Sequence, residues 1–380
     1  MGPSARALYS AASLQRGAPI KIRIARSQAQ KSGASLTPKR PGVRSSHRPT
    51  IQRRRKQLES TTSSPQGQEA VQTPSGRQHR IEYGTQRATV VEVGGGLRTY
   101  EADGFPVVDG YAEDEMASAG RGQVLIPWPN RLADGLYRFG EQTHQLPLSE
   151  AAQSNAIHGL VRWSAWDLID ASPRRVRLGH VLWPQAGYPF TLALELVYEL
   201  SDLGLEVTIA AENAGKQAAP YAAGQHPYIR AELASVEKSV LRLPAEAWLE
   251  TDDRQIPTGR LLGTGGTEYD FNSPRTIGST RLDTPFTGLG RGHDGLAWIE
   301  LTSSDGGRQV AMWLDGAFDY LMAFTGDTLD EATRRRSIAL EPMTCAPDAF
   351  HNCMGLQVLE PGQRVTARWG LVVRSQPTGS

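Results

Sequence analysis

Hydrophobic and polar residues alternate most regularly over residues 191–213. Every second residue from Leu192 to Leu200 is leucine or tyrosine, and the positions between are mostly polar or small. A second alternating run, from Leu205 to Ala211, follows a turn at 201–204. A period of two predicts half-buried strands, whereas a helix would spread these leucines around its whole circumference. The segment is therefore predicted to be a β-hairpin with one face in the core.

Short apolar runs separated by Gly and Pro turns continue along the chain. They predict strands at 88–93, 97–101, 123–126, 163–169, 296–301, 309–314, 320–325, 337–341, 357–359 and 365–373. A further hairpin is predicted at 135–146, and a helical turn only at 345–353. Many closely spaced short strands indicate an all-β sandwich or barrel. Residues 81–375 contain no repeat and no Pro/Ser-rich linker, which favours one domain.

Composition agrees with a turn-rich globular protein, because the 380 residues include 39 Gly and 24 Pro. The two cysteines, Cys345 and Cys353, cannot form a disulfide framework. Free thiols are expected, although a bridge between these two stays open. No apolar run reaches the length of a membrane span. We therefore expect a cytoplasmic protein without a membrane partner.

Charge divides the chain into two parts. Residues 1–58 hold fourteen Lys/Arg and no acidic residue, and the remaining 27 basic and all 40 acidic residues give 59–380 a net charge of −13. The Arg53–Lys56 cluster could contact nucleic acid or an anionic membrane, and the Ser/Arg-rich composition also suits a transit peptide. We favour a disordered, solvated extension over 1–78, or a start site placed too early. The folded domain is predicted over 79–380, with no nucleic-acid partner.

Two segments place a titratable residue beside a proline. His226 lies in the segment 220–228 and precedes Pro227, which favours extended backbone there. Its ordinary pKa near neutrality suits proton transfer, although a lone histidine is more often structural. Glu341 ends the apolar run 338–340 and precedes Pro342. An acid and a base, each at a strand end, could move one proton off a substrate and another onto it.

The remaining polar candidates are weak signals when each is taken alone. Asn130-Arg131 follows a proline-stiffened loop, and the arginine fork suits a pair of hydroxyls, a carboxylate or a phosphate. His158 precedes a glycine. No zinc pattern fits the spacing of the His and Cys residues at 345–353. Core positions are expected for Trp163, Trp166, Trp248, Trp298 and Trp313, and loop positions near a cleft for Trp128 and Trp183.

Taken in order, the motifs resemble the aldose 1-epimerases, or mutarotases. The resemblance covers about 81–375 and rests on Pro127–Gly135, Ile157-His158-Gly159, Gly187–Phe190, Gly224–Tyr228, Ile256–Gly259, Tyr269–Phe271, Leu282-Asp283, Leu340–Pro342 and Leu359–Gly362. It implies the galactose mutarotase-like fold, a large antiparallel β-sandwich (supersandwich) with the sugar in a cleft on one sheet.

The same resemblance implies roles for seven residues and implies no metal or other cofactor. His226 would be the general acid and Glu341 the general base. Sugar hydroxyls would be bound by Asn130, Arg131 and His158, with Asp283 further round the ring and Tyr228 lining the cleft. Galactose-specific members usually show Asn-His where this chain has Gln225-His226, and a second glycine where it has Leu160. The chain is more similar to the bacterial branch that includes sulfoquinovose mutarotase.

These observations predict a mutarotase that acts on a small-molecule sugar as a monomer or homodimer. A glycosidase would need two carboxylates flanking the bond, and the adjacent pair Asp252-Asp253 is more simply a hairpin turn. Two alternatives stay open. The chain could be a non-catalytic carbohydrate-binding or regulatory protein, or it could be a mutarotase for an anionic sugar whose charge pairs with Arg131.

Overall fold

The computed structural model describes residues 73–375. The disordered extension expected at 1–78 lies almost wholly outside the described residues. Regular structure begins at Gln78, three residues before the expected start at Ile81. The first four strands form a small antiparallel sheet: β1 (Gln78–Tyr83), β2 (Gln86–Val91), β3 (Leu97–Ala102) and β4 (Phe105–Pro106).

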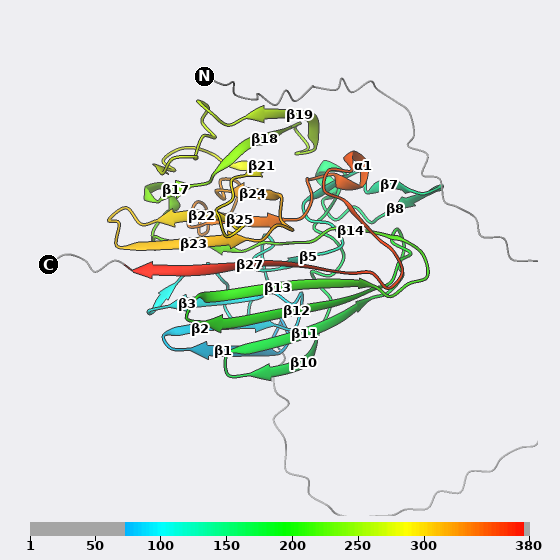
Figure 1. Cartoon of the computed structure of the whole chain (residues 1–380), viewed down its shortest axis with the longest axis horizontal. Helices are drawn as coiled ribbons and strands as arrows, with labels where there is room; N and C mark the ends of the chain where they lie inside the picture. Colours follow the sequence, from blue (N-terminus) through cyan, green and yellow to red (C-terminus); the bar gives the residue numbers. More distant parts are fainter. Residues whose placement is uncertain (1–72, 376–380) are drawn as a thin grey trace, which may run out of the picture. The chain divides into compact units, whose positions relative to one another are not determined.

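Two larger sheets make up most of the fold (Figure 1). The nine-stranded sheet runs, in spatial order, through β10 (Asp167–Ser172), β11 (Arg175–Leu182), β12 (Leu192–Ser201), β13 (Gly204–Asn213), β27 (Arg364–Ser375), β23 (Arg308–Leu314), β22 (Ala297–Thr302), β17 (Val240–Arg242) and β20 (Arg275–Thr276). All of its strand pairs are antiparallel.

The second large sheet has eight strands and carries the candidate site. Its order is β19 (Pro257–Gly263), β18 (Ala245–Thr251), β21 (Asp283–Leu289), β24 (Tyr320–Phe324), β25 (Ile338–Met343), β15 (Gly224–Gln225) and β5 (Val124–Leu125), and β16 (Tyr228–Ile229) also pairs with β25. Short ribbons complete the fold: β6 (Arg131–Ala133) with β9 (Asn155–Ile157), β7 (Leu136–Phe139) with β8 (Gln142–Gln145), and β14 (Ala219–Tyr221) with β26 (Gln357–Leu359). The helical elements are η1 (Ala151–Gln153), η2 (Val236–Lys238) and α1 (Ala349–Asn352).

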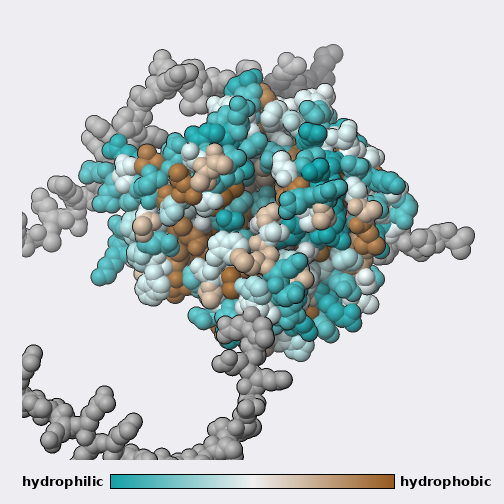
Figure 2. Space-filling model, turned by 180° about the vertical axis from the view of Figure 1, so that it is seen from behind, coloured by the Kyte–Doolittle hydropathy of each residue, from teal (hydrophilic) through white to brown (hydrophobic). Residues whose placement is uncertain are grey.

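One hydrophobic core joins the three main sheets. It includes Leu97 of the four-stranded sheet, Leu196 and Trp369 of the nine-stranded sheet, and Phe286 and Leu340 of the eight-stranded sheet. Strand β12 contributes one face to this core, because its buried and half-buried residues alternate along its whole length. The opposite view shows apolar residues in several groups among polar ones (Figure 2). The predicted antiparallel β-sandwich is confirmed.

Most of the individual elements are confirmed as well. The hairpin at 191–213 pairs Leu192 with Asn213 and Ser201 with Gly204, in continuous register. The hairpin at 135–146 and a helical turn within 345–353 are present as β7–β8 and α1. The strand expected at 163–169 is wrong in its bounds, because β10 begins only at Asp167. Among residues 73–375, no helix has the length and hydropathy to cross a membrane.

Candidate active site

All seven predicted site residues line one cavity of about 340 Å³. They come from separate parts of the chain: Asn130, Arg131 and His158 from the loops around β6 and β9, His226 and Tyr228 from β15–β16, Asp283 from β21 and Glu341 from β25. The cavity therefore gathers a general-acid candidate, a general-base candidate and several hydrogen-bonding groups. Their functional roles stay predictions.

Strand register brings His226 and Glu341 together. Gly224 pairs with Met343, and Tyr228 pairs with Ala339. His226 and Glu341 lie midway between these pairs, so His226 stands beside β25 directly opposite Glu341. The His226 Nε2 and Glu341 Oε1 atoms lie 3.3 Å apart. Both side chains are at least nine-tenths buried. That distance lets a proton pass directly between the two groups.

Burial moves the pKa values of this pair in opposite directions. Burial, together with the smaller effect of the nearby charges of Arg162, Arg121 and Arg131, lowers the pKa of His226 to about 3. It raises the pKa of Glu341 well above its usual value, with Asp283 adding to the rise and Arg131 opposing it. Both shifts favour the uncharged forms. In this uncharged state the pair holds its one transferable proton on Glu341.

Asn130 and His158 hold each other in place from two loops. The Asn130 N–H donates to His158 Nδ1 at 3.2 Å, and the His158 N–H donates to the Asn130 carbonyl at 2.9 Å. Both residues have left-handed backbone, with φ of 56° and 63°. Such backbone is uncommon outside glycine and is often retained at functional sites. The next residue, Gly159, leaves no room for a side chain, because a Cβ there would lie 2.1 Å from the Ile126 carbonyl oxygen.

The contact from Asn130 also fixes the tautomer of His158. Burial lowers the pKa of His158 well below its usual value, so its ring is neutral. Its Nδ1 accepts a hydrogen bond, so the proton lies on Nε2. Potential ligand atoms of His158, His226 and Glu341 do lie within 4.8 Å of one another. A metal would need an unprotonated nitrogen on each ring, and His158 has none left to offer.

Arg131 is already occupied by a partner that sequence reasoning missed. Its Nε and Nη2 donate to both carboxylate oxygens of Glu150 at 2.8 Å. Burial lowers the pKa of Arg131, but the ion pair with Glu150 outweighs this and raises it. Across the cavity, burial raises the pKa of Asp283, while the charge of Arg131 opposes the rise. The charge of Arg131 is therefore largely balanced within the protein.

Arg162 and Trp163 line the same cavity and were not predicted to do so. Burial lowers the pKa of Arg162, and the charge of Glu150 opposes this. Within residues 73–375, the Arg162 side chain forms no ion pair or hydrogen bond. Trp163 is 53% exposed, so the expectation of a core position is wrong. No pattern in the sequence around them would have revealed either residue.

Two expectations near the cleft also change. Trp128 is only 3% exposed and packs in the core instead of standing in a cleft-side loop. Gln225 is fully buried and points away from the cavity, where its side chain bonds Trp369, Tyr198 and the Gly122 carbonyl. The departure from the galactose-specific motif at residue 225 therefore affects the core. Both cysteines are free, Cys345 buried and Cys353 exposed.

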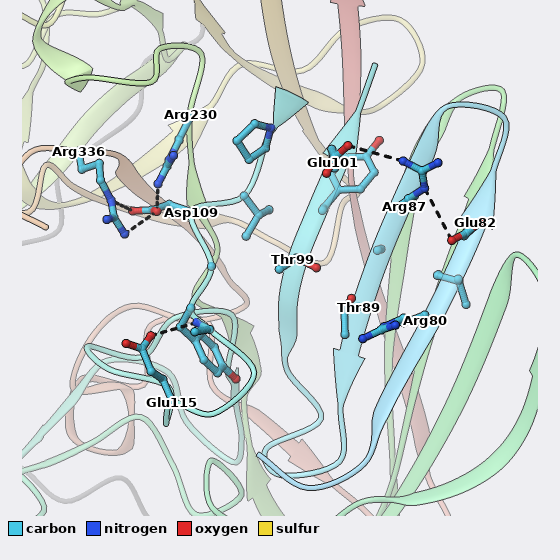
Figure 3. Close-up of a pocket in the computed structure, with 18 residues that line it drawn as sticks. Arg80, Glu82, Arg87, Thr89, Thr99, Glu101, Asp109, Glu115, Arg230 and Arg336 are labelled. Atoms are coloured by element: carbon cyan, nitrogen blue, oxygen red, sulfur yellow. Dashed lines mark hydrogen bonds and ion pairs between the residues drawn. The ribbon is translucent and has the colours of Figure 1, made fainter. Parts of the chain in front are cut away.

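A larger cavity, of about 610 Å³, lies along the four-stranded sheet and contains none of the seven predicted residues (Figure 3). Several of its charged side chains are paired with one another: Arg87 lies beside Glu82 and Glu101, and Arg230 and Arg336 bind Asp109. Its polar lining offers no neighbouring acid and base comparable to His226 and Glu341. The smaller cavity is therefore the candidate active site.

The antiparallel β-sandwich is the fold that the motifs implied, and comparisons with known proteins agree on the fold and the family. The chain belongs to the aldose 1-epimerase family, whose sequence profile matches residues 77–371. It is 35% identical over 290 residues to the uncharacterized protein YihR of Escherichia coli K12, covering 76% of this chain and 91% of YihR.

Two further similarities extend this result. Identity to the maltose epimerase of Levilactobacillus brevis is 28% over 268 residues, covering 64% of this chain and 76% of that enzyme. A solved galactose mutarotase-like protein from Clostridium acetobutylicum superposes with a TM-score of 0.69 at 18% identity, covering 78% of this chain and 95% of that one. The solved structure supports the fold alone. The family assignment supports an isomerase acting on sugars.

Proposed function

We propose that the protein is a mutarotase, which interconverts the α and β anomers of a free aldose. His226 exchanges a proton with the ring oxygen and Glu341 exchanges one with the anomeric hydroxyl. The observation that carries the proposal is the 3.3 Å separation of the two groups inside the same cavity. Each proton transfer is worth about 10²–10⁴-fold in rate.

The proton balance of the pair fits this reaction in both directions. For ring opening, carboxylate Glu341 removes the hydroxyl proton while imidazolium His226 protonates the ring oxygen. Afterwards Glu341 is protonated and His226 is neutral, which is the state that burial favours in the empty cavity. Rotation about the C1–C2 bond of the open chain then exposes the other aldehyde face. Reclosure moves both protons back and gives the other anomer.

The surrounding groups would orient the sugar. His158 presents an Nε2–H donor, and Asn130, Arg131 and Asp283 offer further donors and acceptors along the cavity. Tyr228 lines the cavity and stacks its ring on the imidazole of His226. Held between fixed groups, the sugar presents its anomeric carbon to the acid and the base at once.

Anomer-exchange NMR on freshly dissolved α-D-glucose and α-D-galactose tests the proposal. The protein should accelerate equilibration, and Glu341→Gln should lower the rate by about 10²–10⁴-fold. Glu246→Gln, an exposed carboxylate outside the cavity, is the matched control. Saturable sugar binding without accelerated exchange for any sugar tested would favour a non-catalytic carbohydrate-binding protein instead.

One observation favours an anionic sugar as the substrate. The guanidinium of Arg162 lines the cavity without an ion-pair partner among residues 73–375, whereas Arg131 is already bound by Glu150. A phosphate or sulfonate on the sugar would supply the missing charge. A panel of neutral, phosphorylated and sulfonated sugars decides, because Arg162→Gln should raise KM for anionic sugars far more than for neutral ones. Equal effects on both classes would reject this assignment.

A further inference from the structure

Arg121 is a buried cation directly behind the acid–base pair. Its side chain is 3% exposed, and its Nη2 lies 3.7 Å from Oδ2 of Asp109. Nη1 donates to the Ser118 hydroxyl at 3.1 Å, while Nε and Nη2 have no hydrogen-bond partner among the described residues. Burying a charge with unsatisfied donors is unfavourable. A compensating contribution is therefore expected from what this side chain contacts.

The group that Arg121 contacts is the ring of Tyr228. The guanidinium carbon lies 4.5 Å from the centre of that ring. The Tyr228 ring stacks in turn on the imidazole of His226, with centroids 5.0 Å apart and 19° between the planes. Cation, phenol and imidazole thus form a continuous stack that ends at the proposed general acid. Cation–π contacts strengthen when they are removed from water, as this one is.

Asp109 keeps the far end of this stack from moving. It is 1% exposed and also binds Arg230, Arg336 and the hydroxyl of Ser337, the last at 2.8 Å. These partners come from segments distant in the sequence, so Asp109 has little freedom to rotate. Figure 3 shows its carboxylate between Arg230 and Arg336.

The segment that carries Arg121 also holds the backbone of the stack. The Gly122 N–H donates to the His226 carbonyl at 2.9 Å, and the His226 N–H donates to the Gln123 carbonyl at 3.0 Å. The Tyr228 hydroxyl donates to the Ala119 carbonyl at 3.1 Å. We propose that Arg121 is a positioning residue, which fixes the His226 imidazole against Glu341 through the ring of Tyr228.

Arg121 also acts on the charge of His226. The titratable and charged groups that face this imidazole are Glu341, His158, Tyr228, Arg121, Arg131 and Arg162. Burial is the main cause of the lowered pKa of His226, and Arg121 lowers it further. Removing the cation should therefore raise that pKa. The acidic limb of the pH–rate profile, where the pair gains a second proton, should move to higher pH.

The activity readout rests on the proposed mutarotation, so a second readout is independent of it. Arg121→Met is expected to lower kcat by about tenfold or more and to change KM by less than about twofold, because misplaced catalytic groups lose rate. NMR titration of the His226 imidazole should show a raised pKa. Arg275→Met is the matched control, since it also removes a guanidinium from an aromatic ring, that of Phe271, but lies outside the cavity. This control variant should keep the wild-type kcat and the wild-type pKa of His226.

Arg121→Lys covers the case in which the methionine variant does not fold. Lysine keeps the charge but lacks the planar group, so kcat should still fall while the pKa of His226 changes less. Wild-type kcat and an unshifted His226 titration in Arg121→Lys, and in Arg121→Met if it folds, would overturn the proposal. Equal losses in Arg275→Met would overturn it too. If no sugar is equilibrated by the wild-type protein, the proposed function fails while the NMR titration still decides the role of Arg121.

Discussion

Gly120 packs against the edge of the His226 imidazole, so closely that a Cβ at residue 120 would lie 2.6 Å from the ring carbon Cδ2. Its φ of +76° also lies in the region that favours glycine. The imidazole is therefore confined at its edge by Gly120, on one face by Tyr228, and at 5.3 Å by the ring of His158. This confinement leaves the ring almost no freedom to turn away from Glu341.

From this packing we predict that Gly120→Ala displaces His226 and lowers kcat by about tenfold or more. Gly104→Ala is the matched control, because Gly104 has a similar φ of +75° but no atom within 4 Å of an added Cβ. Both variants should lose some stability from backbone strain, and only Gly120→Ala should lose kcat. Steady-state rates and thermal melts of the two variants check this. A comparable loss of kcat in both would contradict it.

The pH dependence of activity should be asymmetric about neutrality. The active pair holds one proton, so the rate falls only where the pair gains a second proton or loses its first. Burial lowers the pKa of His226 to about 3, so little rate should be lost between about pH 7 and about pH 5. The raised pKa of Glu341 moves the other limb to higher pH than an ordinary carboxyl group would give. A pH–rate profile corrected for spontaneous mutarotation measures this, and a midpoint near pH 6.5 for the acidic limb would refute it.

Glu341→Gln should stabilise the fold while it lowers the catalytic rate. The pKa of Glu341 is raised on folding, so its contribution is most favourable below the usual value of 4.5 and is lost as the pH rises through the folded pKa. Glutamine is uncharged at every pH and avoids this loss. The melting temperature of the variant should exceed that of the wild type by about 2 °C or more at about pH 8, and by less at about pH 5. Glu246→Gln should show no such trend, and a gain independent of pH would argue against a raised pKa.

The Gln225 side chain should matter for stability and not for substrate contact. Its Oε1 accepts from Trp369 Nε1 at 3.0 Å and its Nε2 donates to the Tyr198 hydroxyl at 2.8 Å, all in the core. Gln225→Leu would leave two buried polar groups short of a partner, at a cost of about 2 kcal/mol or more. Urea unfolding measures the loss. A variant that unfolds at the wild-type urea concentration would show that this network adds little.

The parts of the fold that sequence predicted are those in which local pattern and final environment agree. The alternation over 191–213 survives in β12 and β13 because one face of that hairpin meets the core and the other does not. The predicted core position of Trp163 was wrong because its neighbours have the composition of a strand, while its side chain lies at the cavity. Hydrophobicity along the chain carries no information about which loop will border a cleft.

The candidate site likewise contains residues that the sequence predicted and residues that it did not. His226 and Glu341 stand beside prolines in distinctive motifs and were found. Glu150 and Arg121 were not, since each gains its meaning only from a partner distant in the sequence, Arg131 in one case and Tyr228 in the other. Long-range register, such as that which sets His226 opposite Glu341, is likewise invisible before strands are paired.

Strand β27, near the carboxyl end, has a consequence for how the protein is made. It lies between β13 and β23 and so joins two halves of the nine-stranded sheet. It also carries Trp369, which donates a hydrogen bond to Gln225, the residue before His226. During synthesis β13 and β23 expose unpaired edges until β27, which follows both in the sequence, has left the ribosome. We expect the candidate active site to mature only after β27 has been synthesised, and nascent chains that lack β27 to need chaperone protection.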